Sequence, residues 1–180
     1  MTDNMKKPSR GFTIIELLIV IVVVGILASI TIVAFNGIQT KAANMSKTNE
    51  AVAWKKLLEV YKATYDSYPP VPIADYCLGS GFPDGDGIAG GECRDYQLNS
   101  PTYTYHENDN AALMAEIKKV GKLPTGDRTP ISGIVGPYMG IWPTGYIIIT
   151  ILKGGASDCP APTYYVWDNG NGVLLCALDS

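Results

Sequence analysis

The sequence has little of what enzymes use for catalysis. It contains one histidine, His106, among 180 residues, and only 17% of its residues are charged. A single histidine leaves no Ser-His-Asp or Cys-His arrangement, and the chain has neither a nucleophile elbow nor a phosphate-binding glycine loop ahead of a helix. We therefore expect no enzymatic activity and no catalytic residue.

An excess of positive charge is also missing. The formal net charge is −3, and removal of residues 1–11, which carry three basic residues and one acidic residue, would make it −5. Proteins that bind nucleic acid present clusters of Lys and Arg to the phosphate backbone. We predict no nucleic-acid partner.

Proline is absent from Phe12 to Tyr68, and the first part of this stretch is almost entirely apolar. Between Phe12 and Phe35 the only ionisable residue is Glu16. As a helix these residues would extend roughly 35 Å, enough to cross a hydrocarbon core of about 30 Å. The sequence therefore predicts a transmembrane helix over residues 12–36.

A short basic leader precedes the apolar stretch and ends in Gly11. A secretory signal places its cleavage site after the apolar core, whereas here the glycine lies before it. Cleavage after Gly11 would remove the leader and leave the apolar helix on the product. The basic residues Lys6, Lys7 and Arg10 indicate that this end stays in the cytoplasm and that the bulk of the chain lies outside.

This arrangement resembles the class III signal of type IV prepilins and pseudopilins, with Gly11 at the cut, Phe12 as the new N-terminus and Glu16 four residues further on. The resemblance implies cleavage between Gly11 and Phe12, N-methylation of Phe12 and polymerisation into a helical filament. The implied partners are a prepilin peptidase/methyltransferase, a pilus assembly platform and other pilin subunits. One departure is that residues 28–35 lack the proline that many major pilins carry midway along this helix.

Glu16 is interpreted as an assembly residue. A carboxylate inside hydrocarbon costs several kcal/mol unless it is protonated or paired, so such residues are usually functional. After cleavage, the free amine of Phe12 on a neighbouring subunit could neutralise Glu16 and set the axial register between subunits. The alternative is an uncleaved anchor helix in which Glu16 reaches the lipid headgroups.

Beyond Phe35 the helix is predicted to continue, now amphipathic, to Asp66. Apolar residues recur at steps of three and four, which is typical of a core-facing helical stripe. The run from Pro69 to Pro72 ends the helix, and Gly37 could bend it. The stripe consists of Ala51, Trp54, Leu58, Tyr61 and Tyr65.

All four cysteines lie in the part expected outside the cytoplasm, which indicates two disulfides. Four cysteines allow three pairings, and we favour Cys77–Cys93 and Cys159–Cys176 because each joins neighbouring segments. In the loop-entropy model each bond contributes about 3 kcal/mol. The second pair resembles the C-terminal disulfide loop of many pilins.

A glycine-rich loop between the first two cysteines offers a possible calcium site. Asp84, Asp86 and Glu92 supply the hard oxygen ligands that calcium uses. The loop does not match the twelve-residue calcium-binding pattern. The alternative is a turn-rich surface loop in which the aspartates favour turns.

The remaining segments predict an α+β fold in which the long N-terminal helix packs on an antiparallel sheet of three or four strands. We expect a weak edge strand over residues 101–106 and a short helix over 109–120 that Asn108 or Asp109 caps. Residues 124–143 are predicted to be an irregular connection. The sheet strands are expected at 145–152, 163–167 and 173–178. Three parts follow: a leader (1–11), an apolar helix (12–36), and an amphipathic helix with a globular head (37–180).

The sequence thus favours a structural subunit of a type IV pilus, held first in the cytoplasmic membrane and later in an extracellular filament. Chain length and the C-terminal cysteine pair favour a pilus over a type II secretion pseudopilus, which is one alternative. The other alternative is a monomeric, membrane-anchored binding domain. Adhesion, twitching motility and DNA uptake are properties of a whole filament, and no residue in this chain selects among them.

Overall fold

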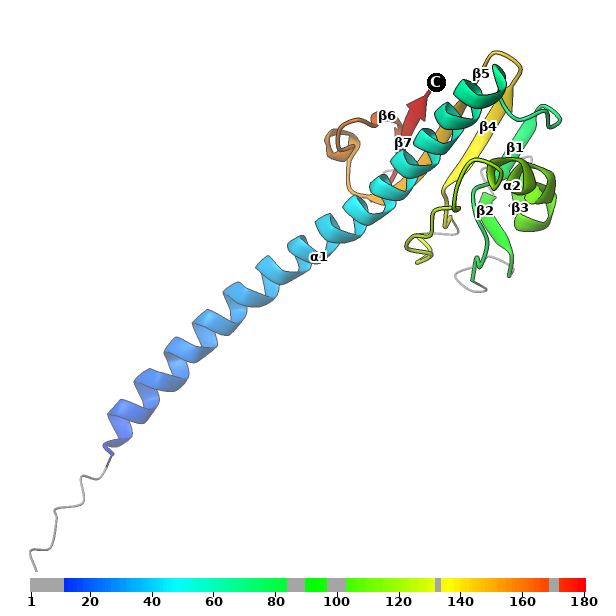
Figure 1. Cartoon of the computed structure of the whole chain (residues 1–180). Coiled ribbons are helices and arrows are strands. Elements are labelled where there is room, and N and C mark those ends of the chain that lie inside the picture. The colour runs from blue at the N-terminus through cyan, green and yellow to red at the C-terminus, as the bar shows by residue number, and fades with distance from the viewer. Residues whose placement is uncertain (1–11, 84–89, 97–102, 132–133, 169–171) are drawn as a thin grey trace, which may run out of the picture. The chain divides into compact units, whose positions relative to one another are not determined.

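The computed structural model describes residues 12–83, 90–96, 103–131, 134–168 and 172–180. The chain divides into two compact units, residues 1–39 and residues 40–180. Each unit is described by itself below. The elements of both are labelled in Figure 1.

Helix α1 spans Ile14–Tyr65 and supplies residues to both units. Its bounds agree with the predicted helix to within one residue at each end. The helix ends where Asp66 adopts a left-handed conformation, with φ of 55°, three residues before the first proline of the Pro69–Pro72 run. Within the first unit, α1 is long enough and apolar enough to cross a membrane, and none of its most apolar 18-residue window is buried.

The second unit contains a five-stranded antiparallel sheet with the order β1-β4-β5-β7-β6 (Figure 1). A separate antiparallel pair is formed by β2 and β3. The strands of the large sheet are β1 (Ala74–Cys77), β4 (Tyr138–Trp142), β5 (Gly145–Lys153), β6 (Tyr164–Asp168) and β7 (Val173–Asp179). The pair consists of β2 (Glu92–Tyr96) and β3 (Tyr103–His106).

The α+β architecture agrees with the prediction, but the sheet has five strands rather than three or four. Strand β4 falls within residues 124–143, for which the prediction of an irregular connection is wrong at Tyr138–Trp142. This segment is rich in Gly and Pro, so its local pattern is weak. It becomes a strand because β1 pairs with one of its edges and β5 with the other.

Helix α2 spans Ala111–Ile117 and follows a 3₁₀ turn, η1, at Glu107–Asn110. The prediction that Asn108 or Asp109 caps this helix is wrong, because the N-cap is Asn110 and it makes no side-chain capping bond. The Asn110 amide instead donates to the carbonyl oxygens of Cys77 (2.6 Å) and Gly79 (2.8 Å). These acceptors lie more than 30 residues away in sequence, so only the folded chain brings them to Asn110.

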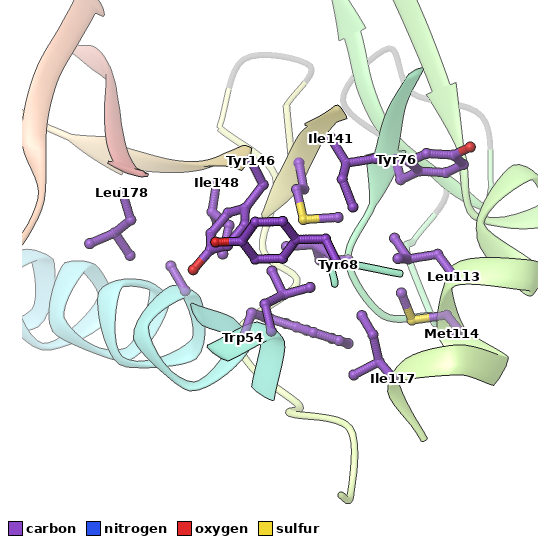
Figure 2. Packing of buried hydrophobic residues seen from close by; sticks show 14 residues of the cluster. Trp54, Tyr68, Tyr76, Leu113, Met114, Ile117, Ile141, Tyr146, Ile148 and Leu178 are labelled. Carbon is purple, nitrogen blue, oxygen red and sulfur yellow. The ribbon is translucent and has the colours of Figure 1, made fainter. Parts of the chain in front are cut away.

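The core of the second unit lies between α1, α2 and one face of the sheet (Figure 2). Trp54 and Leu58 on α1 are fully buried against this face. Tyr65, predicted to belong to the same stripe, is 47% exposed, because it is the last residue of α1. The sheet contributes Tyr76, Met139, Ile141, Tyr146, Ile148 and Leu178 to this core, and α2 contributes Leu113, Met114 and Ile117.

A second core covers other residues of the same strands. It is formed by Tyr138, Ile149, Ile151 and Leu175 of the sheet together with Cys93 of β2. The chain that connects α2 to β4 also enters it, through Ile131, Ile134 and Val135. A 3₁₀ turn, η2 (Ala156–Asp158), lies between β5 and β6.

Candidate functional site

The first turn of α1 is closed by a capping box. Glu16 Oε2 accepts hydrogen bonds from the backbone N–H (2.8 Å) and the hydroxyl (2.7 Å) of Thr13, and the N–H of Glu16 donates to Thr13 Oγ1 (3.3 Å). Such a box satisfies donors that a helix N-terminus otherwise leaves without partners. Glu16 therefore has a role inside its own chain, which the spacing Thr13-x-x-Glu16 would have indicated.

The segment after this turn exposes a continuous apolar surface. Every large apolar side chain described from Leu17 to Ile32 is between 47% and 63% exposed. Phe12 is 83% exposed, whereas Gly11 lies outside the described residues. In water such a surface would be strongly unfavourable, so it indicates a lipid or protein environment around the helix.

The family comparison matches this N-terminal segment. Residues 6–32 fit the model of the prokaryotic N-terminal methylation motif. This match, together with the relatives below, supports a type IV pilin-like family for the chain. The matched residues include the whole Arg10–Glu16 stretch and most of the exposed apolar part of α1.

The chain is also similar to several proteins named type II secretion system core protein G. It is 35% identical over 65 residues to the protein of Dickeya chrysanthemi, which is 36% of this chain and 42% of the relative. It is 37% identical over 60 residues to the protein of Escherichia coli, covering 33% and 41%. With the Vibrio cholerae protein the identity is 36% over 67 residues, covering 36% and 46%.

The chain thus spans less than half the length of the curated relatives it matches. No solved structure matches it.

Two disulfides link segments of the second unit. Cys77 at the end of β1 is bonded to Cys93 in β2, and Cys159 is bonded to Cys176 in β7. The first bond joins the small strand pair to the large sheet. The second attaches the segment that leads into β6 to the strand beside it.

The predicted calcium site falls largely outside the described residues, because Asp84 and Asp86 belong to residues 84–89. Glu92 is described and is buried at the start of β2. Among the described residues, no group of three or more His, Cys, Asp or Glu side chains is placed to hold a metal ion. Calcium binding by the 84–92 loop stays a prediction.

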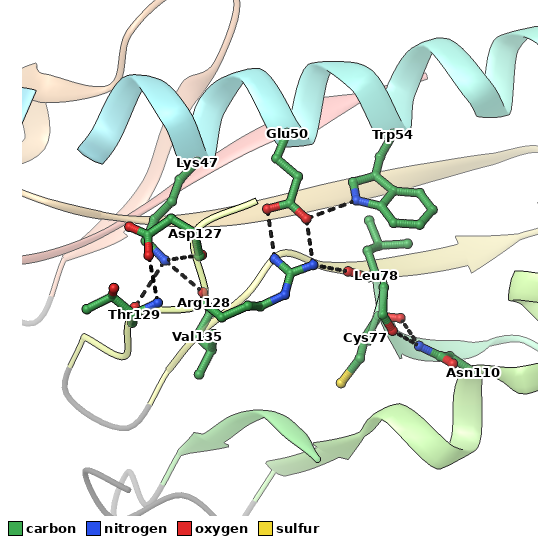
Figure 3. Close-up of polar contacts among 11 residues, drawn as sticks. Lys47, Glu50, Trp54, Cys77, Leu78, Asn110, Asp127, Arg128, Thr129 and Val135 are labelled. Carbon is green, nitrogen blue, oxygen red and sulfur yellow. Dashed lines mark hydrogen bonds and ion pairs between the residues drawn. The ribbon is translucent and has the colours of Figure 1, made fainter. Parts of the chain in front are cut away.

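A cluster of buried charges, which the sequence did not indicate, ties α1 to the connection before β4 (Figure 3). The Glu50 carboxylate, 1% exposed, pairs with both terminal nitrogens of Arg128 at 2.8 and 2.7 Å. The Arg128 guanidinium also donates to the Leu78 carbonyl and lies 4.7 Å from the centre of the Phe82 ring. This bidentate pair joins α1, the end of β1 and the connection.

Lys47 lies one turn before Glu50 and is 3% exposed. Its ammonium group donates to the backbone carbonyls of Asp127, Thr129 and Val135. Burial lowers the pKa of the Lys47 amine, while the carboxylates of Asp127 and Glu50 oppose that shift. No sequence signal marks this residue, because its partners are some 80 residues away.

Three further contacts hold α1 on the sheet and on α2. The Asn44 side chain pairs with both the N–H and the carbonyl of Lys153 at the end of β5. The Tyr146 hydroxyl donates to Glu59 at 2.7 Å, and the Tyr61 hydroxyl donates to Glu116 at 2.6 Å. The second unit therefore holds Asn44 to Tyr61 of α1 through defined polar contacts as well as through its core.

Proposed function

We propose that this chain is a structural subunit of a type II secretion pseudopilus. It is made with a leader, cleaved after Gly11, N-methylated on Phe12, and polymerised through the apolar part of α1. Before assembly the helix anchors the chain in the cytoplasmic membrane with residues 40–180 outside. Its partners are the membrane, other pseudopilin subunits, a prepilin peptidase/methyltransferase and an assembly platform.

The observation that carries this proposal is the match of residues 6–32 to the N-terminal methylation motif. The bare apolar surface of α1 between Leu17 and Ile32 supports it, because a filament bundle would bury that surface once the helix leaves the lipid. Chain length and the C-terminal cysteine pair favoured a type IV pilus. The relatives are named for a type II secretion system, and we give their names more weight.

Processing is tested on the protein extracted from membranes of cells that also make a prepilin peptidase. The N-terminal residue and the intact mass are measured for the wild-type chain and for Gly11→Val. We expect the wild type to begin at Phe12 with one added methyl group and Gly11→Val to keep its leader. A wild-type chain that retains Met1 to Gly11 beside an active peptidase would instead favour a plain membrane anchor.

The type of filament needs a second experiment. The chain is produced in one strain whose type II secretion system lacks its core protein G and in another whose type IV pilus lacks its major subunit. We expect restored secretion and incorporation into sheared filaments in the first strain. Incorporation in the second strain alone would return the assignment to a pilus subunit.

A further inference from the structure

A buried positive charge lies between α1 and the connection that follows α2 (Figure 3). Lys47 Nζ is 2.9 Å from the carbonyl oxygen of Asp127, 3.1 Å from that of Thr129 and 3.3 Å from that of Val135. The three acceptors are all backbone atoms. They come from one segment, residues 127–135.

The geometry requires a protonated amine. An ammonium group has three N–H donors, one for each carbonyl, whereas a neutral amine has two. Several backbone carbonyls converging on one point are also how proteins bind hard cations. Lys47 therefore occupies the position that a cation would take among these oxygens.

The neighbouring charged groups do not take the place of the Lys47 ammonium. The Arg128 guanidinium is engaged by Glu50 and by the Leu78 carbonyl. The Asp127 carboxylate accepts a bond from the N–H of Thr129 at 2.8 Å. The charged side chains near Lys47 are Asp127, Glu50, Arg128 and Lys153. The donor to the three carbonyls is Lys47 itself.

The connection held by Lys47 reaches both cores. Leu123 packs against the core on the α1 side, and Ile131, Ile134 and Val135 belong to the second core. Ile131 and Ile134 exchange backbone hydrogen bonds of 2.9 and 3.2 Å, and the amides of Val135 and Gly136 both donate to the Cys93 carbonyl. Release of the three carbonyls would therefore free a segment that packs against α1 on one side and reaches β2 on the other.

We propose that the carbonyl oxygens of Asp127, Thr129 and Val135 form a cation site that the Lys47 ammonium occupies. Its positive charge, rather than its aliphatic chain, then holds residues 127–131 and 134–135 against α1. A consequence follows for a chain without this side chain. Its empty site accepts a small primary ammonium ion from solution.

The test uses the full chain in detergent and compares Lys47→Met, Lys47→Ala and Lys41→Ala. Met keeps most of the aliphatic volume without charge, and Lys41 is an exposed lysine on the same helix. Hydrogen exchange is followed at the amides of Ile131, Ile134, Val135 and Gly136. Because three buried acceptors lose their donor, we expect exchange roughly tenfold faster or more in both Lys47 variants. Lys41→Ala should exchange like the wild type.

The probe for the empty site is n-propylammonium, with n-propanol as its neutral counterpart. We expect propylammonium to restore slow exchange in Lys47→Ala and propanol to leave it fast. The proposal is overturned if these amides exchange as slowly in Lys47→Met as in the wild type. It is also overturned if propylammonium changes the exchange rate of Lys47→Ala and of the wild type equally. If neither variant folds, the ¹⁵N resonance of Lys47 Nζ in the wild type decides: an ammonium signal at neutral pH supports the site, and a neutral amine refutes it.

Discussion

Thr13 and Glu16 close the first turn of α1 around each other, with the Glu16 carboxylate accepting both the N–H and the hydroxyl of Thr13. The same glutamate is the only ionisable side chain between Phe12 and Phe35. Its local role in starting the helix and its proposed role in assembly are therefore separate properties of one side chain, and substitutions can separate them.

Glu16→Gln is expected to keep the capping box, since Gln serves at this position as Glu does, but to remove the charge. Thr13→Ala removes the two bonds made by the Thr13 hydroxyl and keeps the charge, at a cost of about 1 kcal/mol in helix stability. If the charge sets the register between subunits, Glu16→Gln strongly reduces the yield of sheared filaments and Thr13→Ala reduces it little. Equal yields from Glu16→Gln and the wild type would leave Glu16 with the capping role alone.

Gly126→Ala should destabilise the second unit. A β-carbon at Gly126 would lie 1.9 Å from Glu50 Oε2, and Glu50 cannot easily move because Arg128 holds it. Forced displacement of a packed group typically costs about 1–3 kcal/mol. The matched control is Gly155→Ala, where nothing lies within 4 Å of the added atom, so urea unfolding in detergent should shift for the first variant only.

Trp54→Ala is expected to lower the free energy of unfolding by about 3–5 kcal/mol, because it leaves a large cavity in the core. Trp54 is fully buried and also donates to Glu50 at 3.4 Å. Tyr65→Ala, at the exposed end of the same helix, should cost less than about 1.5 kcal/mol, mainly through its ring contact with Tyr61. Similar losses from both substitutions would contradict the assignment of Tyr65 to the surface.

Two buried phenols should make the fold sensitive to alkali. Burial, together with the bond to Glu116, raises the pKa of Tyr61 to about 12, and burial together with Glu59 raises the pKa of Tyr146 above its usual range. A raised pKa means that the folded chain holds the proton more tightly than the unfolded chain. The resulting stability is complete below about pH 10, the usual tyrosine pKa, and decreases as the pH rises above it.

The measurement is the melting temperature between pH 8 and 12 for the wild type and for Tyr61→Phe with Tyr146→Phe. We expect the double variant to be less stable at neutral pH, since Glu59 and Glu116 each lose the tyrosine hydroxyl that donates to them. It should, however, lose less stability above about pH 10. Parallel curves for the two proteins would show that these phenols do not govern the alkaline limit.

Local patterns were enough for part of this structure. Local signals specify α1 from Ile14 to Tyr65, because an unbroken apolar run is followed by a helical stripe and no proline occurs before Pro69. They also specify β5, whose isoleucine run favours a strand, and the N-terminal signal, whose meaning depends on neighbouring residues only.

The other features depend on contacts between segments that are distant in sequence. Strand β4 has a weak local pattern and depends on its two neighbours, β1 and β5. The Asn110 side chain makes no capping bond to α2, and its amide donates instead to the distant carbonyls of Cys77 and Gly79. The Lys47 site and the Glu50–Arg128 pair join residues some 80 positions apart. Such pairings have no local period in sequence, because their energy comes from contacts that exist only after the connection has folded against α1.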